Sequence, residues 1–144
     1  MTRAMKSSVT REGVRVGLVV AVATWAWLVA VDIFAGQPFR AFVALGGVVP
    51  VTALHVLLNI AYAMAIVALI HAAVREPSVM FALGFGFIMM EFAFAMLTVM
   101  LSHVLGDLAW IQIFGGSIIG ALIALAMLGR KYSLAAQLHR AEKS

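Results

Sequence analysis

Four long apolar runs, separated by short polar gaps, dominate this sequence. A helix needs about 20 mostly apolar residues to cross roughly 30 Å of hydrocarbon, and each run is long enough. None of the runs breaks into the alternating segments of about ten residues that a membrane β-barrel requires. A helix, in contrast, satisfies its own backbone hydrogen bonds in lipid. The pattern therefore predicts an all-α fold, a single-domain four-helix bundle with spans at residues 16–35, 51–74, 79–102 and 108–129.

The gaps between the runs predict short connections. Arg75-Glu76-Pro77-Ser78 indicates a tight turn between the second and third spans, and residues 103–107 join the third span to the fourth. Proline cannot continue a helix and polar residues are expensive in lipid, so both gaps favour chain reversal at the membrane surface. Residues 131–144 are polar and predict a cytoplasmic helical tail.

The first connection, residues 36–49, is longer and unusually apolar. It predicts a short amphipathic helix in the membrane interface, with Phe39 and Phe42 in lipid and Arg40 in water. A re-entrant segment that ends at the Gly46-Gly47 pair is the alternative.

Basic residues are distributed unevenly around the spans. Of the ten lysines and arginines, nine flank the side that carries both termini, and Arg40 alone lies on the other side. The positive-inside rule then places both termini in the cytoplasm, so we expect a multi-pass protein of the bacterial cytoplasmic membrane. A cleaved signal peptide is the alternative for the first span. Its length, its two tryptophans (Trp25 and Trp27) and the lack of a small-x-small site favour a retained helix.

Composition agrees with a membrane protein. The chain is 65% hydrophobic and 11% charged, whereas a soluble domain is about half apolar and a quarter charged. It has no cysteine, which excludes disulfides, thiolate metal sites and thiol catalysis. A pI of 10.1 suggests nucleic-acid binding in a soluble protein. Here the basic residues flank apolar runs, so the bilayer explains them and no nucleic-acid partner is expected.

The end of the first span and the loop after it carry a short motif, W-x4-D-x3-G-x-P. It consists of Trp27, Asp32, Gly36 and Pro38, and Leu45-Gly46, His55 and Glu91 follow it. With this arrangement, most of the chain resembles a group of small, uncharacterised bacterial four-span membrane proteins. The resemblance implies the topology and marks these residues, but it implies no activity, cofactor or partner.

Two polar stripes lie on the second and third spans. At helical spacing, one consists of Thr52, His55, Asn59 and Tyr62, and the other of Glu91, Ala95, Thr98 and Ser102. At about 1.5 Å per residue, neighbouring antiparallel helices put Glu91 level with Tyr62 and within reach of Asn59. We therefore predict a buried polar site and expect the partner of Glu91 on the second span. The site comprises Glu91, His55, Asn59, Tyr62 and Thr98, with Asp32 and Gln112 near its outer mouth.

The polar site has a structural and a functional interpretation. Interhelical hydrogen bonds stabilise membrane bundles by ~0.6 kcal/mol on average, which is enough to explain amides and hydroxyls. A carboxyl group costs about 2.5–3.5 kcal/mol or more at the membrane centre, so Glu91 favours function. Asp32, near the interface, is expected to cap a helix or bind the following loop.

On the cytoplasmic half, the faces that carry the two stripes become apolar. These positions are Ile66 and Leu69 on the second span and Met80 and Phe87 on the third. The sequence therefore predicts a site that opens only to the outer face.

Two arrangements would suit a metal or haem. Met96 and Met100 share a face of the third span with His103, and thioether plus imidazole ligands suit Cu(I). Methionine is also ordinary flexible packing. His55 and His103 both lie near the outer face, where they would suit a bis-histidine haem. No cofactor is predicted from these patterns, and His71, near the cytoplasmic end of the second span, has no evident partner.

The fourth span carries small residues at steps of four. Gly116 and Gly120 allow close helix approach, either within the bundle or with another chain. No phosphate loop, G-x-S-x-G or H-E-x-x-H motif is present, so we expect a protein that is not an enzyme.

These patterns lead to a ranked set of functions. The first is a non-enzymatic subunit or interaction module of a membrane complex, with lipid and other membrane chains as partners in a homo- or hetero-oligomer. The second is a small proton-linked transporter or channel that uses Glu91 with His55, Asn59 and Tyr62. The third is a membrane redox protein that binds haem or metal.

Reporter fusions test the predicted topology. A reporter that is active only outside the cytoplasm should be inactive after Ser78 or Ser144 and active after Gln37, because nine of the ten basic residues lie on the termini side. Activity at Ser144 would contradict an arrangement with both termini inside.

Overall fold

The computed structural model describes residues 3–133, 139–140 and 142–143, and this part of the chain is helical without a strand. Four segments are long and apolar enough to cross a membrane. They are Ser8–Phe34, Val48–Arg75, Val79–Leu108 and Trp110–Tyr132. The prediction of an all-α protein with four apolar helices is confirmed, and these helices indicate a multi-pass membrane protein.

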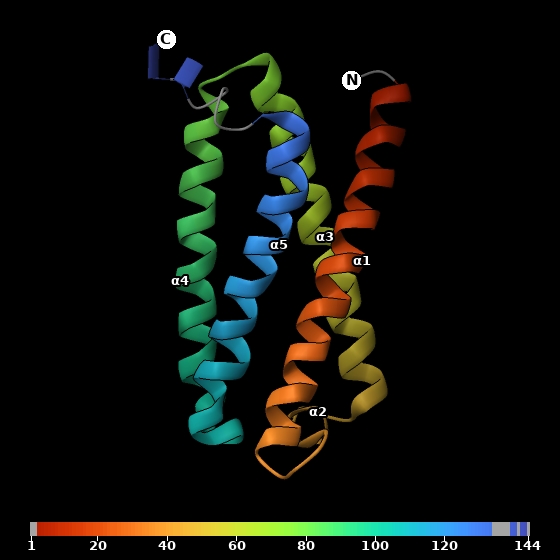
Figure 1. The fold of residues 1–144 in the computed structure, drawn as a ribbon, viewed down its shortest axis with the longest axis vertical. Helices are drawn as coiled ribbons and strands as arrows, with labels where there is room; N and C mark the ends of the chain where they lie inside the picture. Colours follow the sequence, from red (N-terminus) through yellow and green to blue (C-terminus); the bar gives the residue numbers. More distant parts are fainter. Residues whose placement is uncertain (1–2, 134–138, 141, 144) are drawn as a thin grey trace.

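The long helices run up and down, and short helical segments join them. They are α1 (Arg3–Phe34), α2 (Arg40–Ala44), α3 (Val48–Arg75), α4 (Val79–Leu105), η1 (Gly106–Leu108), η2 (Trp110–Phe114) and α5 (Gly115–Tyr132). Both ends of the chain lie at the same end of the bundle as the α3–α4 turn, and α2 lies at the opposite end (Figure 1). We call these the termini end and the α2 end.

Helix boundaries differ from the predicted ones in three places. Helix α1 begins at Arg3 because the polar residues before the first apolar run continue the helix. The predicted link 103–107 is mostly helical, since α4 extends to Leu105. The fourth span opens with a π-helical segment, η2. Half of the predicted tail over 131–144 lies outside the described residues, and its first two residues belong to α5.

Helices α1 and α3 pack backbone to backbone. A Cβ atom on Gly13 would lie 2.5 Å from Met64 Cγ, and one on Gly17 would lie 2.5 Å from Ile60 Cα. Only glycine fits at such a distance, and the G-x-x-x-G spacing presents both positions on one helix face. This spacing was available in the sequence and was not used in the prediction.

The core lies where α1, α3 and α5 meet. Its buried members are Val9, Val16, Val20, Ala63, Val67, Ile70 and Leu128. Gly120 of α5 also faces α1, because a Cβ atom there would lie 3.1 Å from Val20 Cγ1. Gly116 lies against Trp27 of α1 in the same way, at 3.5 Å from Trp27 Cδ1. The small residues of the fourth span are therefore used inside the bundle.

Helix α4 is the outer member of the bundle. In the most apolar stretch of α4, 6% of the residues are buried, compared with 39% in that of α1. Its buried residues are Met80, Thr98 and Leu105. Met80 packs on Ala73, and Leu105 packs on Ala41 and Ala109. Between Met80 and Thr98 no residue of α4 is buried, and a Cβ atom on Gly84 would meet nothing within 4 Å. This stretch of α4 therefore packs loosely against the other helices.

The α1–α3 connection contains the predicted short helix, but one side chain is placed differently. Phe42 is 1% exposed, and its ring centroid lies 5.6 Å from that of Trp25. The expectation that Phe42 lies in lipid is wrong, because Trp25 of α1 offers it a protein surface. Gly46 and Gly47, with φ of +119° and +115°, then lead into α3.

Two glycine substitutions test this arrangement. Gly17→Ala places a methyl group against the α3 backbone, so we expect destabilisation by about 1–3 kcal/mol. Gly84→Ala enters open space and should be neutral or slightly stabilising, since alanine is the better helix former by up to about 1 kcal/mol. Thermal unfolding in mild detergent, followed by circular dichroism, measures both variants. Equal loss in the two would contradict the α1–α3 contact described here.

Candidate functional site

Glu91, near the middle of α4, is half-buried and faces α5. Its Oε2 accepts a hydrogen bond of 2.9 Å from the Ser117 hydroxyl. That hydroxyl also lies 2.7 Å from the Phe114 carbonyl, and its single proton serves one acceptor at a time. The hydrogen-bond partner of Glu91 is thus on the fourth span and not, as predicted, on the second, because a shared depth along two helices does not specify which neighbour a side chain faces.

His55, on α3, is bonded to α1 rather than to Glu91. Its Nε2 lies 2.9 Å from Thr24 Oγ1 and 3.3 Å from the Ala21 carbonyl. Asn59 Nδ2 lies 3.4 Å from the same nitrogen. A carbonyl only accepts and an amide nitrogen only donates, so these contacts are compatible with a proton on either ring nitrogen. The Thr24 hydroxyl can also donate to the Val20 carbonyl, at 2.8 Å.

Thr52 accepts a hydrogen bond of 2.9 Å from Trp25 Nε1 of α1, whereas Asn59, Thr98 and Ser102 bond to their own helices. Asn59 Nδ2 donates to the His55 carbonyl at 2.8 Å. Thr98, fully buried, donates to the Phe94 carbonyl at 2.7 Å, and Ser102 donates to the Val99 carbonyl at 2.6 Å. Hydroxyl and amide side chains in helices often bond in this way, which spacing along a stripe does not reveal.

A cavity of 460 Å³ brings much of the predicted site together. All of the long helices and α2 contribute to its wall, which is mostly apolar. The polar side chains along it are Thr24, His55, Asn59, Tyr62, Glu91, Gln112 and Ser117. Thr98 does not line it. Thr24 and Ser117 were not predicted, because single hydroxyls in apolar runs give no distinguishing signal.

A second cavity of 860 Å³ lies between α3, α4 and α5. In the part of the chain that the structure describes, Tyr62 and Glu91 are the polar side chains in its wall. Both residues therefore border both cavities. The residues of the predicted apolar faces, Ile66, Leu69, Met80 and Phe87, do line it. The space itself was not predicted, and it lies along the stretch of α4 between Met80 and Glu91, where no residue is buried. The larger cavity thus extends from Glu91 toward the termini end of the bundle.

Asp32 joins the first span to the loop and to η2. Its Oδ2 accepts the Ala41 backbone N–H at 2.8 Å, and its Oδ1 accepts Gln112 Nε2 at 2.6 Å. The carboxyl is completely buried. Trp27 of the same motif donates from Nε1 to the Ile111 carbonyl at 2.8 Å. Asp32 therefore binds the following loop, as the sequence suggested, and the motif also anchors the π-helical segment.

Gln112 has one atom without a partner. Its Nε2 bonds to Asp32, and its Oε1 is buried with no hydrogen-bond partner among the described residues. The carboxylate accepts only, so the amide orientation is determined by Asp32. An unsatisfied buried acceptor costs roughly 1–3 kcal/mol.

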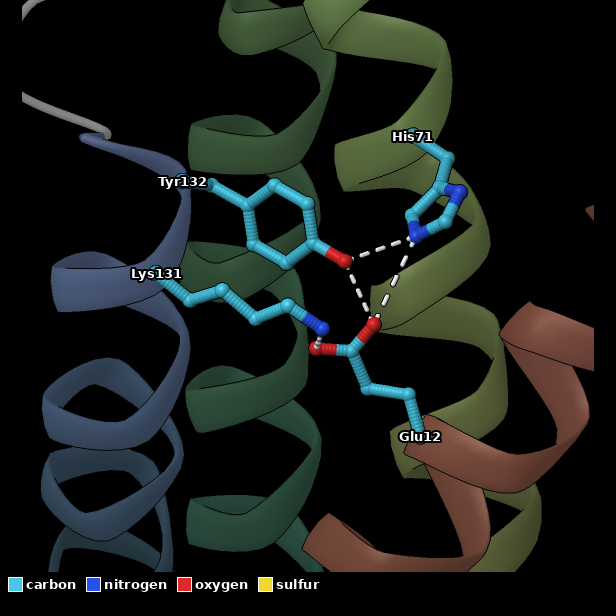
Figure 2. A network of polar contacts seen from close by, with 4 residues as sticks. All are labelled: Glu12, His71, Lys131 and Tyr132. Atoms are coloured by element: carbon cyan, nitrogen blue, oxygen red, sulfur yellow. Dashed lines mark hydrogen bonds and ion pairs between the residues drawn. The ribbon is translucent and has the colours of Figure 1, made fainter.

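A second polar cluster lies at the termini end of the bundle, and it was not predicted from the sequence. Glu12 of α1 accepts from Lys131 Nζ at 2.7 Å and from the Tyr132 hydroxyl, both on α5 (Figure 2). His71 Nε2 of α3 lies 2.8 Å from the Tyr132 hydroxyl and 3.5 Å from Glu12 Oε2. Glu12 is the single acidic residue in the basic segment before the first span, and this could have indicated the cluster from the sequence. The prediction that His71 has no partner is wrong.

The methionine and histidine stripe of α4 faces outward. Met96 and Met100 are 54% and 69% exposed, and His103 is exposed as well. Among the described residues, no group of three or more histidine, cysteine or acidic side chains is placed to hold a metal ion.

Comparisons with protein-family models, curated proteins and solved structures found no match for this chain.

Substitutions at Asp32 test its bonding. Asp32→Ala leaves two buried donors unpaired, so we expect a loss of about 2–5 kcal/mol in unfolding free energy. Asp32→Asn should be much milder. Its oxygen can accept from Ala41, and its amide can donate to Gln112 Oε1 once that amide rotates.

Denaturant unfolding in detergent compares the two variants. Ser102→Ala is the control, since its hydroxyl bonds only within its own turn. Equal loss in Asp32→Ala and Asp32→Asn would show that the negative charge, rather than hydrogen bonding, is needed.

Proposed function

We propose that this chain is a non-enzymatic binding module of the bacterial cytoplasmic membrane, with both termini in the cytoplasm. Its working part is the intramembrane cavity around Glu91, where a small ligand binds. The placement of both termini at the end that carries nine of the ten basic residues supports this orientation. The small four-span proteins that the chain resembles support a bacterial origin.

The observation that carries the proposal is a carboxyl group in the middle of a span, facing a cavity. A glutamate that served only to join helices would be replaced at lower cost by an amide. Glu91 has one neutral partner, Ser117, and its side chain remains half-buried. Ligand sites are typically 300–1,000 Å³, mostly apolar, with a few polar groups. Both cavities, of 460 and 860 Å³, have these properties.

The attachment of α4 supports a site that is entered from the bilayer. Helices α1, α3 and α5 form a frame held by glycine contacts, a shared core and polar clusters at both ends. Helix α4 is buried at Met80, Thr98 and Leu105, and Glu91 bonds it to Ser117 of α5. Between Met80 and Glu91 it has no buried residue, so this stretch can move while the frame stays in place.

Native mass spectrometry of gently purified protein tests the proposal. The wild-type chain is expected to carry a copurified small molecule, and Glu91→Gln should lose most of it because the amide cannot pair with a cation or accept strongly. Ser102→Ala, a polar substitution on the same helix outside the cavities, should retain it. Thermal unfolding confirms that each variant is folded. A wild-type chain that is always empty would contradict the proposal.

A second candidate is a subunit of a membrane complex. The observation in its favour is the low burial of α4, whose apolar surface is available to another chain as well as to lipid. If this is the function, a second chain should copurify in mild detergent. Substituting outward-facing Met96 and Met100 by Leu should leave the copurified small molecule unchanged and weaken the association of the chains.

Proton-linked transport is a third candidate, because Glu91 borders both cavities. Flux into proteoliposomes that contain this chain alone, abolished in Glu91→Gln, would favour it over a binding module.

A further inference from the structure

The carboxyl group of Glu91 carries an unused acceptor on the wall of the 460 Å³ cavity. Glu91 bonds to Ser117 through Oε2, and its Oε1 accepts no hydrogen bond from the described residues. Gln112 Oε1 also has no partner among the described residues, but it is fully buried and does not face the open space. Helix α4 therefore presents a hydrogen-bond acceptor to this space.

The walls of both cavities carry an acidic side chain and no basic one among the described residues. In the described part of the chain no lysine or arginine lines either cavity, and Glu91 is the side chain there that can be an anion. The other buried carboxylate, Asp32, lies outside the wall and already accepts two hydrogen bonds. Any ligand that pairs with Glu91 must therefore bring the positive charge with it.

Aromatic rings complete the surroundings of the carboxyl group. Tyr62 borders both cavities, Phe94 lines the smaller one, and Phe114 lines the larger one. The face of an aromatic ring attracts a cation, and the attraction grows to about 2 kcal/mol when the cation is desolvated. The remainder of the wall is aliphatic, so it fits an apolar body and repels water.

We propose that the cavity binds a lipophilic monocation, a protonated amine that carries an apolar body. This inference rests on the proposed function and names its ligand class. The ammonium pairs with Glu91, while the apolar body lies along the aliphatic wall of α3, α4 and α5. A neutral ligand rich in carbonyl groups, such as a quinone, would bring no donor for the carboxylate of Glu91.

Equilibrium dialysis against the chain in lipid nanodiscs tests this with two matched probes. Decylamine, protonated at pH 7, and decanol share an apolar body and differ in charge and in the number of donors. After subtraction of empty nanodiscs, decylamine should bind the wild-type chain at least tenfold more tightly than decanol. Glu91→Gln should lose this preference, and Ser102→Ala should keep it.

The outcomes separate the ligand class from the proposed function. Equal binding of the two probes to the wild type, or an unchanged preference in Glu91→Gln, would overturn the lipophilic cation while a copurified molecule could still support a binding module. The wild-type comparison needs no variant, so the inference stays testable even if Glu91→Gln does not fold. Failure of both probes together with an empty purified chain would overturn both proposals.

Discussion

The close contact between α1 and α3 is the constraint on which the rest of the structure depends. Gly13 and Gly17 let the two backbones meet, and no other residue would fit at those distances. In lipid, helices gain little from hydrophobic burial, so close packing and hydrogen bonds hold them together. Once α1 and α3 are joined, α5 packs in the groove beside them through Gly120 and the shared core.

Polar groups then hold this three-helix frame at both ends. At the termini end, Glu12 links α1 to Lys131 and Tyr132 of α5, and His71 of α3 joins them. At the α2 end, Asp32 and Trp27 link α1 to the π-helical segment before α5. The faces of α1 and α5 that these contacts use are not available to α4. The fourth helix has no buried residue between Met80 and Thr98, and the larger cavity lies along this stretch.

The sequence predicted the positions of the helices well, but it predicted less well which helix faces pack against one another. Length and hydropathy specify a membrane span because the bilayer thickness does. Which face of a span meets which neighbour depends on steric fit, and helices this apolar on all sides carry little amphipathic signal. That is why Glu91 was placed opposite α3 and is found bonded to Ser117 of α5. Asp32 was predicted to bind its own loop, which is a local interaction and needs no knowledge of packing.

The border position of Glu91 distinguishes a binding site from a path across the membrane. In the smaller cavity, polar side chains continue along the wall from Glu91 to Asn59, His55 and Gln112. In the larger cavity, the described wall beyond Tyr62 and Glu91 is apolar. A bare charge that moved on into that space would lose its partners in a low-dielectric surrounding, at a cost of several kcal/mol. A cation that binds at Glu91 is therefore held there, and its apolar body, rather than its charge, suits the larger cavity. This asymmetry favours binding over conduction for the chain acting alone.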